Sequence, residues 1–270
     1  MPATPAPAAT LILLRDGEIS PEVLMLERHA RSDFLPDMYV FPGGRVEQQD
    51  RQLADRVTGV DAVSAAARIG TVPPDEALGF FVAAIRETFE ECGVLLARRR
   101  GYRELLDADR AAELSLHRLD VQGGQMPFRD IVEAHDLELA ADRLAVHGHW
   151  ITPEAVPRRF DTLFFAAVAP AGQHAAHDGV EATDCTWLRP EDALEQMAAG
   201  ERSIIFPTAC NLETVTGFRS AEEALKASHQ RPLVVVLPEL VEEDGVRRLQ
   251  IPPEAGYPTT QQLLERSTRP

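Results

Sequence analysis

Short apolar runs separated by turn residues open the chain. Two such runs, at 10–15 and 22–28, flank the dipeptide Asp16-Gly17. Runs of this length bounded by glycine and other turn residues are typical of strands joined by a turn. Residues 38–41 predict a further short strand that leads into a turn at Pro42-Gly43-Gly44. The pattern therefore predicts that the chain begins with β-structure.

The strongest helical pattern runs from Asp75 to Cys92. Apolar side chains recur there at the spacing of one helix face, and this face should pack on a sheet. Asp75 follows Pro73-Pro74 and is the expected N-cap, while Gly93 occupies the position of a C-cap. Residues 45–74 are weakly patterned, first polar and then rich in alanine, which predicts an inserted loop with some helix.

The remaining pattern predicts both helices and strands. We expect helices over 102–117 and 128–144, strands over 160–168 and 184–188, a short helix over 190–199 that begins with proline, and a late strand over 234–237. The sequence carries no internal repeat and no obvious linker. The predicted organisation is an α/β (α+β) chain with a flexible N-terminus over 1–9 and a single domain over 10–270, with insertions at about 51–74 and 102–146.

Composition and charge argue against several classes of protein. Hydrophobic residues make up 44% of the 270 positions, which is enough for a sizeable core. No apolar run reaches the roughly 18 residues that span a bilayer. The Pro/Ala-rich start does not read as a signal peptide, and the last residues do not form a peroxisomal address, so we expect a cytoplasmic protein without a membrane partner. The net charge of −16 argues against a nucleic-acid-binding surface, which would need a basic stripe.

Cysteine and histidine show no spacing of a metal site or a disulfide framework. The cysteines are scattered and odd in number, which predicts reduced thiols. The histidines that occur close together in the sequence lack further ligands at zinc-like spacing, so packing or surface positions are expected. The residues concerned are Cys92, Cys185, Cys210, His147, His149, His174 and His177.

Three glutamates share one side of the predicted helix. Glu87, Glu90 and Glu91 fall on a strip at the edge of the apolar face, because residues three and four apart are neighbours on a helix. Like charges at this spacing repel each other and cost about 0.2–0.5 kcal/mol per pair. A hard divalent cation would reverse the sign of that interaction, since it takes carboxylate oxygens and can bridge to substrate phosphates. By themselves the three residues also fit an ordinary solvated acidic face.

The residues around these glutamates resemble the Nudix box. Residues 86–94, Arg-Glu-Thr-Phe-Glu-Glu-Cys-Gly-Val, are similar to its second half, and Phe41-Pro42-Gly43-Gly44 is similar to the start of its first half. Asp50 stands where the family usually has glutamate, and Thr88 stands where it usually has an aliphatic residue. The stretch between Asp50 and Arg86 is much longer than in the usual box.

A box split in this way resembles one branch of that family, the acyl-coenzyme A diphosphatases of the peroxisomal type. Other segments similar to that branch are Phe34-Leu35-Pro36, Trp150-Ile151-Thr152-Pro153, residues 157–162 with Phe164-Phe165, and Glu181 followed by Trp187. The resemblance spans about residues 10–215. It implies a Nudix-type α/β/α sandwich with a mixed sheet and a helical insertion.

The resemblance also implies hydrolysis of a diphosphate linkage with Mg2+ or Mn2+ as the cofactor. The metal ligands that it implies are Glu87, Glu90, Glu91 and the carbonyl of Gly43. Arg86 then orients a neighbouring glutamate through a charged hydrogen bond, with a surface salt bridge as the alternative. The general base is left open between Glu90, Glu91 and Glu181. Whether Asp50 also serves the site is left open.

Anionic substrates need cations, and a few arginines are placed to supply them. Arg28 lies at the end of the second predicted strand, while Arg158 and Arg159 precede Phe160 and the strand 160–168. Guanidinium groups bind phosphates in a bidentate manner. We take these four residues as candidate substrate-binding residues, with ordinary surface charges as the alternative for the arginines.

Three hypotheses of function follow. The first is hydrolysis of coenzyme A or acyl-coenzyme A to adenosine 3′,5′-bisphosphate and (acyl-)phosphopantetheine. The second changes the substrate to ADP-ribose, a nucleotide sugar or a dinucleotide, because the box handles only the diphosphate. The third is a non-catalytic binding or regulatory module, since a fold does not guarantee an activity. The three intact glutamates argue against this third hypothesis, and homodimer formation is compatible with the sequence.

Overall fold

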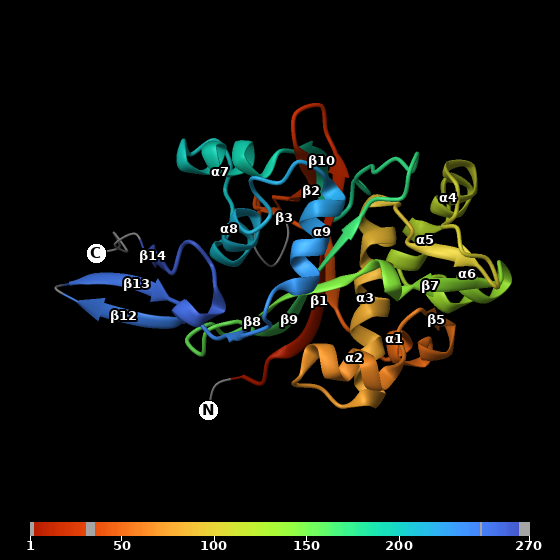
Figure 1. Cartoon of the computed structure of the whole chain (residues 1–270), viewed down its shortest axis with the longest axis horizontal. Helices are drawn as coiled ribbons and strands as arrows, with labels where there is room; N and C mark the ends of the chain where they lie inside the picture. The colour runs from red at the N-terminus through yellow and green to blue at the C-terminus, as the bar shows by residue number, and fades with distance from the viewer. Residues whose placement is uncertain (1–2, 31–35, 244, 265–270) are drawn as a thin grey trace.

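The computed structural model describes residues 3–30, 36–243 and 245–264 (Figure 1). Its central mixed sheet contains β1 (Ala6–Asp16), β2 (Pro21–Arg28), β3 (Tyr39–Val40), β4 (Gly43–Arg45), β8 (Ala145–Ile151), β9 (Phe160–Val168), β10 (Ala182–Leu188) and β11 (Val235–Val236). The main strand order is β10-β2-β1-β9-β8-β11, with β3 paired to β2 and β4 paired to β1. β1 runs parallel to β9 and antiparallel to β2, so the sheet is mixed, as expected.

Alternation along β1 divides the hydrophobic core between the two faces of the sheet. Leu11 and Leu13 pack with helix α3 (Pro74–Cys92) on one face. Ile12 and Leu14 pack on the other face with residues of α7 (Pro190–Ala198), α8 (Phe206–Glu213) and α9 (Ala221–Gln230). Successive side chains of a strand point to opposite faces, so one strand serves both cores. The sheet is therefore the middle layer of an α/β/α sandwich (Figure 1).

Helix α3 begins two residues earlier than an N-cap at Asp75 would place it. Pro73 is its N-cap and Pro74 is its first residue, so the prediction of Asp75 as N-cap was wrong. Proline suits the first helical position because its fixed φ is helical and its missing N–H would have no helical partner there. The predicted C-cap is confirmed, since Gly93 has a φ of 74° and its N–H donates to the carbonyl of Phe89.

The chain between β4 and α3 is a loop with some helix, as predicted. It forms α1 (Gln48–Gln52), η1 (Ala54–Arg56), β5 (Val57–Thr58) and α2 (Ala62–Ile69). The prediction of two long helices over 102–146 was wrong in part. The structure has α4 (Ala108–Ser115), α5 (Arg118–Gln122), α6 (Phe128–Ala134), then β7 (Leu137–Ala140) and η2 (Ala141–Arg143). β7 pairs with β5 and with β6 (Ala97–Arg99), and these distant partners favour a strand over a continued helix.

Several other elements differ from their predicted extent. β1 begins at Ala6, β10 begins at Ala182, and α7 ends at Ala198. Helices α8 and α9 were not predicted. Neither were η3 (Pro253–Ala255) and the C-terminal sheet of β12 (Glu239–Glu243), β13 (Val246–Gln250) and β14 (Gln261–Leu263). β12 and β13 project from the body of the molecule at the left of Figure 1, and we call this three-stranded sheet the C-terminal arm.

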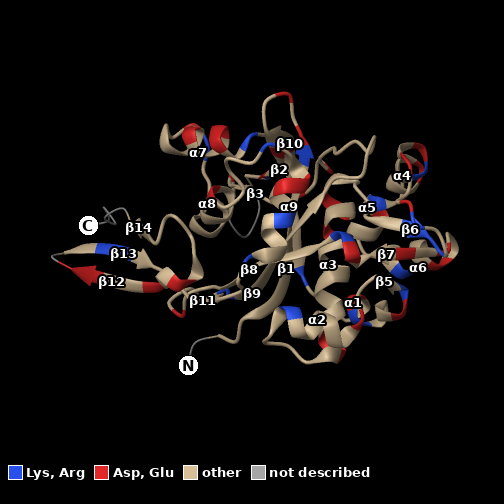
Figure 2. Cartoon of the chain, in the orientation of Figure 1, with Lys and Arg blue, Asp and Glu red and all other residues tan. Residues whose placement is uncertain are grey.

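Several smaller predictions can also be compared with the structure. The three cysteines are free, with Cys92 and Cys210 buried and Cys185 half-buried. His147 and His149 are buried packing residues. Within the described residues, no helix is long and apolar enough to cross a membrane. Acidic side chains gather on α7 and β12 as well as on α3 (Figure 2). Phe34 and Leu35, which contribute to the family resemblance, lie outside the described residues.

Candidate active site

The paired glycines at 43 and 44 form a strand against β1. Gly43 pairs with Thr10 and Gly44 with Ala9, so the predicted turn at this point is instead β4. A Cβ on Gly43 would lie 2.6 Å from the carbonyl oxygen of Ala9, and a Cβ on Gly44 would lie 2.4 Å from Oε1 of Glu87. Glycine is needed at both positions because the backbone is wedged between β1 and the glutamate side of α3.

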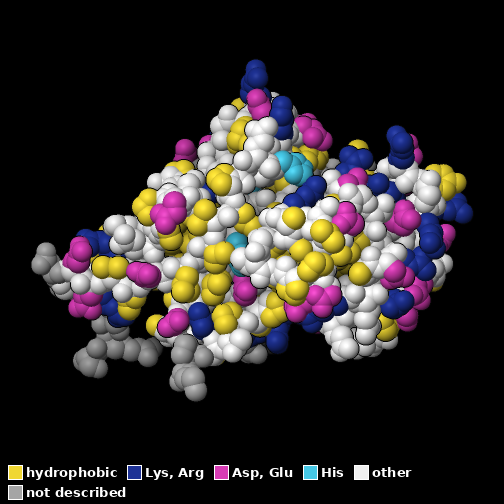
Figure 3. Space-filling model, turned by 60° about the horizontal axis from the view of Figure 1, so that its bottom comes forward, with side chains coloured by type: hydrophobic (Ala, Val, Ile, Leu, Met, Phe, Trp, Pro, Cys, Tyr) yellow, Lys and Arg dark blue, Asp and Glu magenta, His cyan; other side chains and the backbone are white. Residues whose placement is uncertain are grey.

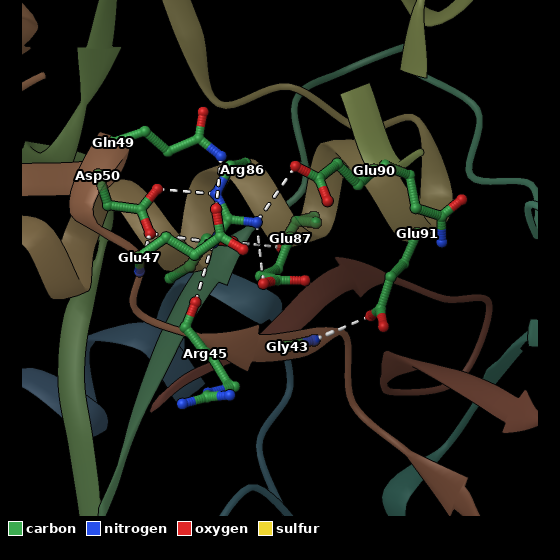
Figure 4. A network of polar contacts seen from close by, with 12 residues as sticks. Gly43, Arg45, Glu47, Gln49, Asp50, Arg86, Glu87, Glu90 and Glu91 are labelled. Atoms are coloured by element: carbon green, nitrogen blue, oxygen red, sulfur yellow. Dashed lines mark hydrogen bonds and ion pairs between the residues drawn. The ribbon is translucent and has the colours of Figure 1, made fainter. Parts of the chain in front are cut away.

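Arg86 lies at the centre of a buried polar network, with 2% of its side chain exposed (Figure 4). Its Nε and Nη2 donate to Oδ1 and Oδ2 of Asp50 at 2.7 and 2.9 Å. Its Nη1 donates to Oε1 of Glu87 at 2.9 Å and to Oε1 of Glu90 at 3.1 Å. Nη2 also donates to the carbonyl oxygen of Arg45 at 2.9 Å. These contacts are not those of a surface salt bridge, and they fix the positions of two of the three glutamates.

Asp50 joins the two distant halves of the box. It is fully buried on α1, and besides binding Arg86 it accepts the backbone N–H of Glu47 at 2.7 Å. Helix α1 and α3 pack against each other, so the long intervening stretch loops out and returns. Both oxygens of Asp50 are engaged by the protein itself. The structure therefore gives Asp50 a positioning role rather than direct access to a substrate.

The three glutamates of α3 have two hydrogen-bond partners between them. Arg86 contacts Glu87 and Glu90, whereas Oε2 of Glu91 accepts the N–H of Gly43 at 2.9 Å (Figure 4). Among the described residues, no group of three His, Cys, Asp or Glu side chains is arranged so that it could hold a metal ion. The donor set nevertheless suits a hard divalent cation, since it offers carboxylate oxygens from adjacent turns of one helix. For a cation to bind, the carboxylates have to converge from the arrangement described here.

The electrostatics of the glutamates indicate a shortage of positive charge. Burial raises the pKa of Glu87 to about 8; Arg86 opposes this rise and the Glu90 carboxylate adds to it. Burial and the neighbouring Glu87 raise the pKa of Glu91 well above its usual value, although the N–H of Gly43 opposes the change. The pKa of Glu90 is also raised, again chiefly by burial. One arginine does not compensate these carboxylates, so a bound cation would favour their ionised forms.

A cleft of about 1310 Å³ opens beside this network. The predicted site residues that line it are Arg28, Gly43, Arg86, Glu87, Glu90, Arg158, Phe160 and Glu181. The guanidinium carbon of Arg158 lies 5.5 Å from the ring centre of Phe160, which is the distance of a cation–π contact. Glu91 is not among the residues that line the cleft.

Arg159 has a different role from the one that the sequence predicted. Its side chain does not line the cleft, and the residue is only 8% exposed. Nε donates to the carbonyl oxygen of Thr152 at 2.9 Å, and Nη1 donates to the carbonyl oxygen of Ala3 at 2.9 Å. Arg159 therefore links Ala3 to the β8–β9 connection through hydrogen bonds. Because its guanidinium group is used in this way and does not line the cleft, the prediction that it binds substrate is corrected.

Arg28 ends β2, and Glu181 comes directly before the neighbouring strand β10. Arg28 pairs with Ala182 across β2 and β10, and the N–H of His29 donates to the carbonyl oxygen of Glu181 at 2.8 Å. Both charged groups affect the pKa of Glu91, with Glu181 raising it and Arg28 lowering it. Glu181, a candidate for the general base, and Arg28 therefore lie at the same end of the cleft as the α3 glutamates.

The sequence did not predict several residues that line the cleft. Glu47 lines it together with Gly44, and an acid shortly after the Gly-Gly pair in the sequence was the available signal. Trp150 lines another wall, where its Nε1 donates to the hydroxyl of Tyr257 at 2.8 Å and that hydroxyl donates to Asn211 at 3.2 Å. One face of the C-terminal arm also borders the cleft. These contacts join residues far apart in sequence, so no local pattern could reveal them.

Comparison with known proteins identifies the family. The chain is 29% identical to acyl-coenzyme A diphosphatase NUDT19 of Xenopus laevis, over 78% of this chain and 64% of that protein. It is 31% identical to the protein of the same name from Gallus gallus, over 80% of this chain and 67% of that protein. The chain thus spans about two thirds of the length of these curated relatives.

A solved structure supports the same assignment. The crystal structure of a NUDIX hydrolase from Alicyclobacillus acidocaldarius matches with a TM-score of 0.64 and 28% identity, and it covers 83% of this chain and 96% of that one. The sequence model of the NUDT19 Nudix domain matches residues 55–214, which is more than half of the chain. Taken with the Arg86 network and the split box, these matches show that the chain belongs to the NUDT19 Nudix domain family.

Proposed function

We propose that this chain is an enzyme that hydrolyses the diphosphate linkage of coenzyme A or acyl-coenzyme A. The products are adenosine 3′,5′-bisphosphate and phosphopantetheine or its acyl thioester. The observation that carries the proposal is the buried glutamate cluster of α3, which Arg86 positions and which opens into a long cleft. The names of the two vertebrate relatives support this choice of substrate.

The proposed cofactor is Mg2+, with Mn2+ as a substitute. Glu87, Glu90 and Glu91 would hold it, together with the carbonyl of Gly43. When bound, such a cation neutralises phosphate oxygens and lowers the pKa of a coordinated water. Carboxylate oxygens are the ligands that these hard cations take, and the raised pKa values of the three glutamates favour a positive charge beside them.

The side chains of the cleft have distinct proposed roles. Arg28 and Arg158 would bind the substrate phosphates, because both line the cleft and guanidinium groups suit phosphate oxygens. A carboxylate would accept a proton from the attacking water while the bridging oxygen leaves with the other phosphate. Glu181 and Glu90 line the cleft and remain candidates for this base, whereas Glu91 does not line it and accepts the N–H of Gly43. Arg86 would act as a positioning residue.

A substrate panel tests the proposal directly. The protein is incubated with Mg2+ and, separately, with coenzyme A, acetyl-coenzyme A, ADP-ribose, a nucleotide sugar and a dinucleoside polyphosphate, and the products are separated by chromatography. We expect coenzyme A compounds to yield adenosine 3′,5′-bisphosphate. Turnover of ADP-ribose or a nucleotide sugar alone would move the enzyme to another substrate class. Binding without turnover of any compound would favour a regulatory module.

The site assignment has its own test. Glu90→Gln removes a charge from the cluster but keeps its volume, so we expect kcat to fall by about 100-fold or more, the usual contribution of a group that handles a proton in the transition state. Glu195→Gln on the exposed side of α7 is the matched control and should leave kcat unchanged. Equal activity of the two variants would contradict the assignment.

Cytoplasmic location and assembly as a homodimer stay predictions, which cell fractionation and gel filtration test.

A further inference from the structure

One face of the C-terminal arm forms a wall of the cleft. In the arm, Leu240 lies opposite Leu249, and Leu249 lies opposite Gln262, so these three side chains point to the same side of the sheet. The residues of the arm and its immediate flanks that line the cleft are Pro238, Leu240, Arg247, Leu249, Gln262 and Leu264. Val241 and Leu263 belong to the alternate positions, and neither lines the cleft. The pleat of the sheet therefore directs one set of side chains to the cleft and the other set away from it.

The cleft side of the arm is largely aliphatic. Leu240 is 42% exposed there, its cross-strand partner Leu249 is half-buried, and Leu264 is half-buried as well. Ile204 and Phe206 extend the apolar lining from the body of the protein. Hydrophobic side chains gather between the arm and the rest of the molecule on the face displayed in Figure 3. The same cleft reaches Glu87 and Glu90, so this apolar wall is continuous with the proposed catalytic end.

The cleft is larger than a site for a typical small molecule. The cleft volume of about 1310 Å³ exceeds the roughly 300–1,000 Å³ of common small-molecule sites. The described arm residues that line the cleft include no aromatic ring for stacking on a base. By contrast, Phe160 with its neighbouring Arg158 offers a ring and a cation elsewhere in the cleft. An aliphatic chain is the ligand chemistry that the arm face fits.

We propose that the C-terminal arm binds the acyl chain of an acyl-coenzyme A substrate and sets the preference for chain length. This inference rests on the proposed function. The thioester end would extend from the diphosphate at α3 along the cleft to the arm, where methylene groups cover Leu240 and Leu249. Each methylene that leaves water on such a wall strengthens binding. Catalytic efficiency therefore rises with chain length until the wall is covered.

The test compares Leu240→Asp with the control Leu263→Asp. Both leucines belong to the arm and both are exposed, 42% and 66%, but only Leu240 lines the cleft. We measure kcat/KM for coenzyme A, butyryl-coenzyme A and lauroyl-coenzyme A. In Leu240→Asp we expect kcat/KM for the lauroyl ester to fall about ten-fold, with coenzyme A changed by less than about two-fold, because a charge on the wall opposes apolar contact. Leu263→Asp should keep the wild-type ratio.

The other outcomes separate this inference from the proposed function. Turnover of coenzyme A with an unchanged lauroyl-to-coenzyme A ratio in Leu240→Asp would leave the function standing and overturn the role of the arm. An equal loss on all three substrates would also overturn it, since the arm would then contact a part that they share. If Leu240→Asp eluted from gel filtration at a smaller oligomeric mass than the wild type, the cleft face of the arm would instead contact a second copy of the chain, and the proposal would be overturned. If the wild-type protein hydrolyses none of the three, both ideas fail.

Folding of the variant is controlled separately. Thermal unfolding of Leu240→Asp should match the wild type within a few degrees, because Leu240 is already substantially exposed. Leu240→Ala provides a milder version with no added charge. It should reduce the lauroyl-to-coenzyme A ratio in the same direction by a smaller factor, and an unchanged ratio in a folded Leu240→Ala and Leu240→Asp pair would contradict the proposal.

Discussion

At the scale of single residues, close packing decides which atoms can approach the α3 glutamates. Gly44 shows this most directly, because its missing side chain leaves the space that the carboxylate of Glu87 occupies. His147 shows a different constraint, that of a buried titratable group. Its Nδ1 lies 2.9 Å from the hydroxyl of Ser228, and its Nε2 lies 2.8 Å from the hydroxyl of Thr214. Each residue yields a prediction.

Gly44→Ala should impair activity by displacing a proposed metal ligand. The new Cβ would lie 2.4 Å from Oε1 and 2.5 Å from Cδ of Glu87, so the carboxylate has to move. A displacement of a catalytic group by about 1 Å can lower the rate by about 100-fold. Gly70→Ala is the comparison, since its Cβ meets nothing within 4 Å and only its φ of 77° is unfavourable. It should lower stability without lowering kcat/KM, and a Gly44→Ala variant with normal kcat/KM would contradict the prediction.

His147 should make the protein less stable in mild acid. Burial, with a smaller effect of Arg231, lowers the pKa of the folded-state imidazole to about 3 from its usual 6.5. Below pH 6.5 the unfolded chain binds a proton that the folded protein does not, so the free energy of unfolding falls as the pH drops from 6.5 toward 3. At pH 5 the loss is about 2 kcal/mol. The hydroxyls of Ser228 and Thr214 also lie within hydrogen-bond distance of the carbonyl oxygens of Ala224 and Asn211. A neutral imidazole has one donor and one acceptor, so the hydroxyl that faces its acceptor nitrogen has to donate to the ring in place of that carbonyl.

The measurement is urea unfolding at pH 7.5 and pH 5 for the wild type and His147→Gln. Glutamine keeps a donor and an acceptor but does not titrate, so the variant should lose less stability than the wild type between the two pH values. The absolute stability of the variant is not the readout, because repacking affects both pH values alike. Identical pH dependence in the two proteins would show that His147 is not the responsible group.

At the scale of elements, α1 and α3 act as one unit. Asp50 of α1 and Arg86 of α3 form a bidentate pair that is almost completely buried. Burial by itself would lower the pKa of Arg86, but its hydrogen bonds to Asp50 and the nearby glutamates raise it overall, so the guanidinium stays charged. Helix α3 carries both the proposed ligands and Arg86, which positions two of them. Helix α1 supplies Asp50, which holds Arg86 in place. The long stretch between the two is compatible with the site because α1 packs directly on α3.

Asp50→Asn should weaken both the fold and the catalytic site. Removing one partner of a buried ion pair costs about 3–5 kcal/mol, although Glu87 and Glu90 still neutralise Arg86 and should keep the loss at the lower end. Activity should fall by about 10–100-fold, as for residues that orient metal ligands. Asp50→Glu should recover part of the activity, because it restores the charge. If Asp50→Asn were as active as the wild type, α1 would have no positioning role.

At the scale of the whole molecule, two layers of helices enclose a sheet, and residues of its central strands β1 and β9 help to line the cleft. The carboxylate network lies at the α3 side of the cleft, and the C-terminal arm borders it from the other side of the molecule (Figure 1). The net charge of −16 makes the whole molecule repel an anionic substrate. A divalent cation bound at the glutamates would offset this repulsion where it matters most.

Divalent cations should stabilise the folded protein. A ligand that binds only the folded state adds about 2.7 kcal/mol when it is present at 100 times its Kd. We therefore expect Mg2+ or Mn2+ to raise the Tm by several degrees relative to protein in EDTA. NaCl at matched ionic strength controls for screening, and Glu87→Gln should reduce the shift. A cation-independent Tm in the wild type would contradict the proposed ligand set.

The sequence alone determined the local features of this protein. Helix α3, its C-cap at Gly93 and strand 160–168 followed from periodicity and from the properties of glycine, which act over a few neighbouring residues. The box residues identified the family because Arg86, Glu87, Glu90 and Glu91 are close together in sequence. Only the identity of each side chain and its spacing were needed for these conclusions.

The tertiary structure alone decided the long-range contacts. Pairing with β1 made Gly43 and Gly44 a strand, and pairing with β5 and β6 made residues 137–140 a strand where local pattern favoured a helix. The packing of α1 on α3 brings Asp50 to Arg86. Arg159 donates hydrogen bonds to two backbone carbonyls and does not line the cleft. Such choices depend on which distant groups satisfy a hydrogen bond or fill a space, and a linear pattern does not encode those distances.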